Sequence, residues 1–579
     1  MCYNGHKQSK GETLVIPFPE YPRPALRRDS FLNLNGSWSY AITADEALPH
    51  AWDGEILVPY SPETAASGVR RTLQPNQWLH YQCMFTPPDG VGGRVLLHFG
   101  AVDNDCVILV NHREVGRHSG GYWPFSADIT SLLREGENIL RVTVRDNADD
   151  PTFAYGKQRY KRGGMWYTAQ SGIWQTVWLE SVPEVYVKSL RITPEFDEAR
   201  VRIELETALE SSAAITCDVR AADGSFVAGS WAKGGVCVVP LPGFRAWTPD
   251  DPYLYTLDIT CGEDRVESYF AMRKFSYVEL GGHKVFGLNN APLFHNGLLD
   301  QGYYPDGLLT PPSDEAMVND IETMKRCGFN MLRKHIKIEP LRWYYHCDRL
   351  GMIVWQDMVS GGQPYSFLHV SALPTLGKVD LPDQDAKPYG RSGVLSRARF
   401  RREMADTVRL LYNCPCIALW TVFNEGWGQF DALDMANELK KLDPTRFIDH
   451  ASGWQDQGYE EMKSRHIYFR PVKLKNDGRA LALTEYGGYI LAVDGHRWTD
   501  KVFGYRICRN SAALAHDYEK LMLGQVLPHI RKEGLTAAVY TQITDVEEEL
   551  NGLMAYDREV LKIPEETLRE INAALRFDA

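Results

Sequence analysis

The stretch that decides the fold reads IALWTVFNEGWG and covers residues 417–428. Seven residues suited to a buried strand end directly on Asn424 and Glu425, and glycines follow. A second stretch, LALTEYGG at residues 481–488, repeats this design and places Glu485 at the end of its apolar run. Short continuous apolar runs are typical of strands that are buried on both faces, as in a parallel sheet. A carboxylate in such a place is a poor core residue unless it is paired, so both glutamates are candidates for chemistry.

Around these stretches, from about residue 276 onward, helical patterns alternate with short apolar strands. Ser313 precedes two acidic residues, which predicts the N-terminus of a helix. A long helix is predicted around residues 511–532. Residues 359–395 are rich in Gly, Pro and Ser and are predicted to form one long loop over the C-terminal face of a barrel. About eight β units in about 300 residues suit a (β/α)8 barrel, so residues 276–579 are predicted to form a TIM barrel.

The first 275 residues show a different pattern, in which short strands alternate apolar and polar side chains. The segment Leu140–Arg145 is one example, with its apolar residues on one face. Residues 1–182 are therefore predicted to form an antiparallel β-sandwich. Residues 183–275 contain seven or so such strands, which predicts a small immunoglobulin-like sandwich that serves as a spacer.

Composition excludes several classes of partner. The chain has 579 residues and a formal net charge of −12, with no basic stripe, which argues against nucleic acid. No apolar run approaches the roughly 20 residues that a membrane span needs, and the N-terminus lacks the apolar core of a signal peptide. The eleven cysteines are scattered along the chain and are expected to be reduced and mostly buried, which indicates a cytoplasmic protein.

Polar residues at the C-terminal ends of barrel strands are the catalytic candidates. The predicted strands carry or end on Arg333, His335, Asp357, Asn424, Glu425, Tyr468 and Glu485. Two carboxylates there suit retaining glycoside hydrolysis, which needs a nucleophile and an acid/base about 5–5.5 Å apart. The nucleophile must stay ionised, and Arg333 and Tyr468 are able to support its charge. The acid must be protonated at rest, which burial and a nearby negative charge favour.

At these residues the sequence resembles glycoside hydrolase family 2, the family of β-galactosidases, β-glucuronidases and β-mannosidases. The resemblance covers almost the whole chain and includes FLNLNGSW at 31–38, GGYWPF at 120–125 and SGIW at 171–174. It implies that the sandwich of residues 1–182 is a jelly roll. It also implies that Glu425 is the acid/base, that Glu485 is the nucleophile, and that Arg333 and Tyr468 contact and orient the nucleophile. Asn424, beside the acid/base, is placed to hold a sugar 2-hydroxyl.

Departures from the family pattern bear on the sugar and on metals. The position three residues after Glu485, a histidine in well-known β-galactosidases, is Gly488, and the Asn-x-Lys element by which β-glucuronidases hold a uronic carboxylate is absent. His335 follows Arg333 by two residues instead of three, so a structural role and a sugar contact are both open for it. Asp357 echoes the metal ligands of large β-galactosidases only faintly, so neither a metal nor a cofactor is expected.

Weaker candidates for substrate binding lie at other strand ends and loops. Asp300 and Gln301 follow the first barrel strand, Trp427 forms an aromatic wall near the acid/base, and Gln542 and Asp545 end the last strand. A salt bridge is an equal alternative for Asp545. Asp149 and its neighbour Asp150 lie where a jelly-roll loop can enter the site. The remaining tryptophans that were considered, Trp123, Trp166 and Trp174, are expected in the core.

The sequence therefore predicts a retaining exo-β-glycosidase, most similar to the β-galactosidases, with a carbohydrate as its substrate. β-Mannosidase, β-glucuronidase or arabinopyranosidase activity, transglycosylation, and carbohydrate binding by a non-catalytic scaffold stay open. No nucleic-acid or membrane partner is expected, and homo-oligomerisation is left open.

Overall fold

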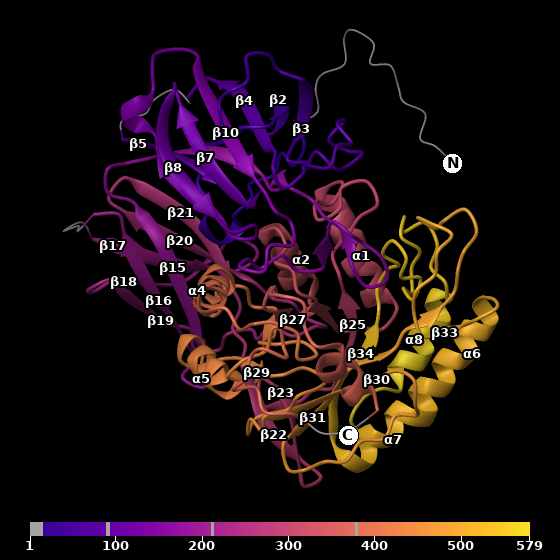
Figure 1. Ribbon diagram of the computed structural model, residues 1–579. Helices are drawn as coiled ribbons and strands as arrows, with labels where there is room; N and C mark the ends of the chain where they lie inside the picture. The colour runs from indigo at the N-terminus through magenta and orange to yellow at the C-terminus, as the bar shows by residue number, and fades with distance from the viewer. Residues whose placement is uncertain (1–15, 88–92, 210–213, 377–379, 579) are drawn as a thin grey trace.

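The computed structural model describes residues 16–87, 93–209, 214–376 and 380–578, and Figure 1 shows two β-sandwiches beside a barrel. The first sandwich combines a six-stranded sheet, in the order β3-β2-β4-β10-β7-β8, with a four-stranded sheet, in the order β1-β14-β5-β9. The strands of the larger sheet are β2 (Gly36–Thr43), β3 (Gly54–Val58), β4 (Trp78–Phe85), β7 (Asp105–Val110), β8 (Arg113–Ser119) and β10 (Asn138–Arg145). Those of the smaller sheet are β1 (Phe31–Asn33), β5 (Arg94–Phe99), β9 (Phe125–Asp128) and β14 (Val177–Val182).

The alternation predicted for residues 140–145 explains how this sandwich forms its core. In β10, Leu140, Val142 and Val144 are buried against the opposite sheet, and their neighbour Arg141 points to the other face and donates to Gln82. β10 pairs antiparallel with both β4 and β7. The prediction of a jelly-roll sandwich at the N-terminus is confirmed.

Within residues 183–209 and 214–275, the second sandwich has seven strands in two sheets, ordered β15-β16-β19 and β18-β17-β20-β21. The strands are β15 (Val187–Glu195), β16 (Arg200–Thr207), β17 (Ile215–Arg220), β18 (Phe226–Trp231), β19 (Val236–Pro240), β20 (Tyr255–Cys261) and β21 (Asp264–Phe270). Cys217, Cys237 and Cys261 lie in its core as free thiols. The immunoglobulin-like sandwich is thus observed as predicted.

Eight parallel strands form the barrel, in the order β29-β28-β27-β26-β25-β34-β31-β30. They are β25 (His295–Asp300), β26 (Met331–Lys334), β27 (Ile353–Asp357), β28 (Ile417–Thr421), β29 (Phe447–Asp449), β30 (Met462–Ile467), β31 (Ala480–Gly487) and β34 (Leu535–Thr541). β29 and β30 end the hydrogen-bonded order, and the Ser464 hydroxyl joins them, 3.0 Å from both Asp449 Oδ1 and the Ala451 carbonyl oxygen. The barrel is therefore nearly closed, and the predicted TIM barrel is confirmed.

Helices surround the barrel, and a small sheet covers its N-terminal end. The helices are α1 (Asp314–Arg326), α2 (Leu341–Leu350), α4 (Val394–Leu411), α5 (Ala432–Leu442), α6 (Ser511–Leu521), α7 (Leu527–Glu533) and α8 (Glu565–Ala573). The hydroxyl of Ser313 accepts from the Ala316 N–H at 3.2 Å, so the predicted N-cap is confirmed. The sheet of β22 (Phe275–Leu280), β23 (His283–Leu288) and β24 (Ala291–Pro292) packs Phe286 against Phe447 at the start of β29.

Two details differ from the predictions. The helix predicted over 511–532 is interrupted by a π-helical turn, Met522–Val526, between α6 and α7. Pro528 follows this turn, and because it has no N–H the α-helical ladder cannot pass through it unchanged. The predicted loop 359–395 contains a π-helical turn, Leu368–Ala372, and the short α3 (Leu373–Thr375), while its residues 377–379 lie outside the described part. Among the described helices, none combines the length and apolar character that a membrane span requires.

Candidate active site

Arg333 joins the groups at the floor of the barrel's C-terminal end. Its guanidinium is fully buried and donates to both oxygens of Asp357, at 3.0 Å each. It also donates to Asn424 Oδ1 at 2.8 Å, and to Glu485 Oε1 and the Thr484 carbonyl oxygen at 3.1 Å each. One cation from β26 therefore orients side chains from β27, β31 and the loop after β28.

Asp357 is committed to protein partners on both of its oxygens. In addition to Arg333, the His335 ring nitrogen Nδ1 lies 2.8 Å from Asp357 Oδ2. Burial alone would raise the pKa of Asp357, but Arg333 and the His335 hydrogen bond outweigh it and lower the pKa to about 2. Burial in turn lowers the pKa of His335. The two sequence candidates Asp357 and His335 thus lie together as supports of Arg333.

Each oxygen of the Glu485 carboxyl group accepts a hydrogen bond from a protein donor. Its Oε1 accepts from Arg333, and its Oε2 accepts from the Tyr468 hydroxyl at 2.5 Å. The strand predicted over residues 467–469 is in fact β30, which ends at Ile467, so Tyr468 directly follows the strand. The Tyr468 ring stacks on Tyr505 with ring centroids 3.9 Å apart. Only 6% of the Glu485 side chain is exposed. A cation and a hydroxyl donor thus stabilise its negative charge where little water reaches it.

Glu425 follows β28 on a tight turn of left-handed backbone. Its φ is 54°, and the φ values of Gly426 and Gly428 are 74° and 69°. A Cβ on Gly426, directly after the glutamate, would lie 2.9 Å from Gln455 Cγ, and one on Gly428 would lie 2.9 Å from the Gly361 carbonyl oxygen, so glycine suits both positions. A non-glycine residue with positive φ costs on the order of 1 kcal/mol or more, which functional sites often tolerate. The turn directs the carboxyl group towards the open end of the barrel, and 19% of the side chain is exposed.

The two glutamates lie close together but differ in electrostatic environment. Burial raises the pKa of Glu425, opposed chiefly by the positive charge of Lys157 and further by Arg333. One oxygen of Glu425 and one of Glu485 lie within 4.8 Å of each other and of a ring nitrogen of His466. The pair therefore contains one carboxyl group that favours its neutral form and one that is supported as an anion.

His466 is a site residue that sequence reasoning missed. Its Nδ1 lies 2.8 Å from Glu425 Oε1 and 3.6 Å from Glu485 Oε2, and its Nε2 lies 3.2 Å from the Ser452 hydroxyl. Burial lowers its pKa to about 3, so the ring is neutral at neutral pH. Its spacing was an available signal, because residues two apart on a strand share a face and His466 precedes Tyr468 by two.

A cavity of about 720 Å³ opens above this floor. Of the predicted residues it is lined by Asn424, Glu425, Trp427 and Tyr468. The first sandwich contributes Lys157, Met165 and Trp166. Trp166, expected in the core, is half-buried and packs against the core, and it also lines the cavity, edge-on to Trp427 with ring centroids 5.1 Å apart. Trp123 and Trp174 are buried as expected.

Lys157 is a second residue that sequence reasoning missed. Its ammonium group lies 5.8 Å from the centroid of the Trp166 ring. The ammonium group makes no hydrogen bond or ion pair with any residue in the described ranges, whereas the backbone carbonyl oxygen of Lys157 accepts from the Tyr167 N–H at 2.9 Å. Its positive charge opposes the burial-driven rise in the pKa of Glu425 and of Glu549, a buried carboxylate nearby. The jelly roll therefore sends a cation, and not the expected Asp149 or Asp150, into the site.

The remaining candidates take part in contacts within the protein. Asp300 accepts from Lys334 at 2.6 Å, Gln301 donates to Gln542 at 2.9 Å, and Gln542 donates to Asn551 at 2.9 Å. Asp545 accepts from Lys562 at 2.5 Å, which is the salt bridge considered for it. Asp149 lies 3.6 Å from Arg159, and Asp150 accepts from the backbone N–H of Thr152 at 2.8 Å. The structure brings none of these six side chains into the lining of the cavity.

Three models of one family match the chain in the order of its three parts. They are the sugar binding domain of glycosyl hydrolases family 2 at residues 56–183, the glycosyl hydrolases family 2 model at 185–273 and its TIM barrel domain at 311–473. The chain belongs to glycosyl hydrolase family 2. The barrel match includes Arg333 and Glu425 and ends before Glu485.

Two curated relatives of this family 2 chain differ in the activity they are named for. A β-galactosidase of Halalkalibacterium halodurans is 23% identical over 68% of the chain and 38% of its own length. A β-glucuronidase of Bacteroides fragilis is 22% identical over 74% of the chain and 61% of its own length. The chain thus spans less than two thirds of each relative.

Solved structures of family 2 members share the fold over nearly the whole chain. A β-glucuronidase from an uncultured Clostridium superposes with a TM-score of 0.74 at 18% identity and covers 97% of this chain and 100% of its own. A β-galacturonidase from Eisenbergiella tayi, bound to galacturonate, gives a TM-score of 0.71 at 18% identity with the same coverage of both chains. At such identity the likeness concerns the fold alone.

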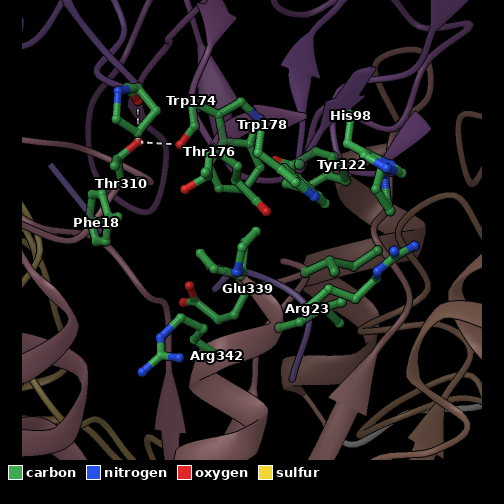
Figure 2. A pocket seen from close by; sticks show the side chains of 18 of the residues that line it. Phe18, Arg23, His98, Tyr122, Trp174, Thr176, Trp178, Thr310, Glu339 and Arg342 are labelled. Carbon is green, nitrogen blue, oxygen red and sulfur yellow. Dashed lines mark hydrogen bonds between the residues drawn. The ribbon is translucent and has the colours of Figure 1, made fainter. Parts of the chain in front are cut away.

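A second cavity in this family 2 chain, of about 280 Å³, lies between the first sandwich and the barrel (Figure 2). Its two arginines are paired within the protein, Arg23 with Glu180 and Arg342 with Asp314. The Thr310 hydroxyl at its edge donates to the Trp174 carbonyl oxygen at 2.8 Å. None of the residues predicted for chemistry is among its described lining residues.

Proposed function

We propose that the chain is a retaining exo-β-glycosidase that works by double displacement. The observation that carries the proposal is the carboxyl pair, whose nearest oxygens lie within 4.8 Å. Retaining enzymes hold their two carboxyl groups about 5–5.5 Å apart, whereas inverting enzymes need about 6.5–9.5 Å to admit a water molecule between them. Catalysis takes place in the barrel of residues 276–579, the jelly roll of residues 1–182 supplies Lys157, and the immunoglobulin-like part of residues 183–275 is a spacer.

In the first step, Glu485 attacks the anomeric carbon while Glu425 gives its proton to the glycosidic oxygen. The bond from the anomeric carbon to that oxygen breaks, the alcohol leaves, and an ester forms between the sugar and Glu485. Burial raises the pKa of Glu425, which favours the protonated form that this step needs. Arg333 and Tyr468 donate hydrogen bonds to the two oxygens of Glu485 and orient it for attack.

In the second step, Glu425 accepts a proton from water, which attacks the anomeric carbon and breaks the ester. The free sugar leaves with its original configuration. Asn424 uses its Oδ1 to accept from Arg333, which leaves its amide N–H groups as the donors that can serve the sugar 2-hydroxyl. That contact strengthens as positive charge develops on the ring in the transition state.

A β-galactosidase-like glycone is the first candidate, supported by the sequence resemblance and by relatives named β-galactosidase. An acidic glycone such as a uronic acid is the second candidate, and Lys157 favours it. An ammonium without an ion-pair partner in the described structure, set beside the catalytic carboxyl groups, suits a substrate carboxylate. Relatives named β-glucuronidase support the same alternative.

A panel of p-nitrophenyl β-glycosides tests the activity, and NMR of the first sugar released tests retention. The proposal expects hydrolysis of at least one member, with the β-anomer formed first. Release of the α-anomer would contradict retention. Binding of a sugar by titration calorimetry with no turnover on any member would instead support a non-catalytic scaffold, and transfer of the sugar to an added alcohol in preference to water would indicate a transglycosylase.

A further inference from the structure

The mouth of the active-site cavity differs in chemistry from its floor. Residues at the mouth come from five separate segments and are mostly apolar or aromatic: Met165, Trp166, Phe367, Val370, Ala372, Pro374, Leu376, Trp454, Ile467, Phe469, Phe503 and Tyr505. Polar side chains are concentrated at the floor, where Asn424, Glu425 and His466 lie. The volume of about 720 Å³ falls in the range of about 300–1,000 Å³ that holds drug-sized ligands, so the cavity has room beyond one sugar ring.

Three large apolar side chains at this mouth are exposed to solvent. Phe367 is 72% exposed, Leu376 is 67% exposed and Phe469 is 70% exposed. Phe367 and Leu376 belong to the loop after β27 and Phe469 follows β30, so their convergence on one opening is not a consequence of one apolar run. Contiguous exposed apolar surface at a cavity marks a binding site, because burying it in water-free contact with a ligand is favourable.

The position of the acid/base determines which part of the substrate meets this mouth. The proton of Glu425 goes to the glycosidic oxygen, so the leaving alcohol lies on the side of Glu425. The Glu425 side chain is 19% exposed and lines the cavity, whereas Glu485 is 6% exposed and lies deeper. The sugar therefore occupies the floor, and the leaving group extends between the exposed apolar side chains.

We propose that the substrate is a β-glycoside of a large apolar alcohol, an aromatic or polycyclic one, rather than a disaccharide. This proposal rests on the glycosidase function proposed above. A second sugar at the mouth would need several hydrogen-bonding side chains around its hydroxyls. Apart from Lys157 and the indole N–H groups of Trp166 and Trp454, the polar side chains that the described mouth offers are those of Ser371 and Arg470 and the hydroxyls of Tyr365 and Tyr505. Tyr365 and Tyr505 already bond to Ser371 and Tyr468 respectively.

The test compares three substrates of the same glycone with the full-length protein. They are the 2-naphthyl glycoside, the glycosyl fluoride, whose leaving group is a single atom, and a β-linked disaccharide. We expect the 2-naphthyl glycoside to exceed the disaccharide in kcat/KM by at least about tenfold after correction for leaving-group acidity, for which a series of substituted phenyl glycosides supplies the calibration. A disaccharide that equals or exceeds the corrected naphthyl value would overturn the proposal.

Variants at the mouth provide the second arm. Phe367→Ser and Phe469→Ser remove exposed rings, so the fold should not depend on them. Each should lower the ratio of the naphthyl to the fluoride kcat/KM by about tenfold, the effect of losing roughly 1.4 kcal/mol of contact. Phe226→Ser is the matched control, since Phe226 is 60% exposed on the immunoglobulin-like part and should leave the ratio unchanged. An unchanged ratio in both mouth variants would also contradict the proposal.

The fluoride separates failure of this proposal from failure of the glycosidase function. If the protein hydrolyses a glycosyl fluoride but shows no preference for the naphthyl glycoside, the proposal of an apolar leaving group is refuted and the proposed glycosidase function stands. No turnover of any fluoride or aryl glycoside would remove both proposals.

Discussion

The floor and the mouth of the active-site cavity are built by opposite means. At the floor, Arg333, Asp357 and Glu485 are buried on parallel strands, and each of their charged groups is paired within the protein. At the mouth, Phe367 and Phe469 lie outside the barrel strands, and their side chains face solvent. The difference suggests a division of tasks, in which strands hold the groups whose distances must be exact and connecting segments meet the variable part of the substrate.

The largest expected effect on kcat/KM comes from removing the negative charge of Glu485 at the floor. Glu485→Gln keeps the shape of the side chain but removes the charge that attacks the anomeric carbon. We expect kcat/KM on a p-nitrophenyl glycoside to fall at least about 10⁴-fold, as for loss of other covalent nucleophiles. Steady-state kinetics measure this, with Glu206→Gln, an exposed glutamate of the second sandwich, as a control that should match the wild type. A Glu485→Gln enzyme within tenfold of the wild type would refute its role as nucleophile.

The next largest effect concerns the proton of Glu425, which lines the cavity above Glu485. Glu425→Ala should lower kcat/KM by about 10²–10⁴ on substrates with poor leaving groups, and far less on activated ones. Because burial raises the pKa of Glu425, the first step should slow as pH rises through that raised pKa, where the group loses its proton. A pH profile of the wild type should therefore show an alkaline limb that Glu425→Ala lacks. Persistence of the same limb in the variant would assign it to another group.

A third prediction concerns stability instead of rate. Asp357→Asn leaves the Arg333 charge buried without its two-point partner, and the loss of one member of a buried pair costs about 3–5 kcal/mol. Urea denaturation should show this loss in the free energy of unfolding. Asp53→Asn is the matched control, because Asp53 pairs with Arg71 on the surface and such pairs contribute about 0–1 kcal/mol. Equal losses in the two variants would mean that the floor is not held by this pair.

A fourth prediction concerns Lys157, the cation that the jelly roll contributes to the cavity. If the glycone is acidic, Lys157→Met should lower kcat/KM on a β-glucuronide or β-galacturonide by about tenfold or more, because a hydrogen bond to a charged group contributes about 1.5–3 kcal/mol. The loss on the matching neutral glycoside should be smaller. Equal losses on both would leave the β-galactosidase-like candidate as the better one.

The smallest expected effect is at Asp149, which the sequence offered as a site residue from the same sandwich. Asp149 lies beside Arg159 and does not line the cavity. Asp149→Asn should change kcat/KM by less than about twofold, as surface substitutions away from a site usually do. A tenfold loss measured with the naphthyl glycoside would show that this loop reaches the substrate.

Strand-end residues were predictable because the period and length of apolar runs report burial. Glu425, Glu485 and Arg333 each end or occupy a strand whose neighbours are apolar, and all three lie together at the floor. Asp300 and Gln542 satisfy the same criterion, yet they bond to Lys334 and Asn551. A strand end places a residue on the correct face of the barrel, but it does not say whether a neighbouring side chain already occupies its oxygens.

Residues from outside the barrel were the part that could not be predicted. Lys157 precedes a short strand far from the carboxyl pair in sequence, and nothing in its own surroundings distinguishes it from any other lysine. Its role depends on how the jelly roll packs on the barrel. The same packing turned Trp166 from an expected core residue into a wall of the cavity.

By itself, the sequence determined the three-part architecture and the position of Glu425 and Glu485 at the ends of barrel strands, because apolar periodicity and the residues that end each strand are local properties of the chain. Only the tertiary structure decided which neighbours those groups have. His466 between the two glutamates, Lys157 above them and the apolar side chains at the mouth come from segments that are brought together by packing. Distances between such segments depend on the whole fold, and the chemistry of a site depends on those distances.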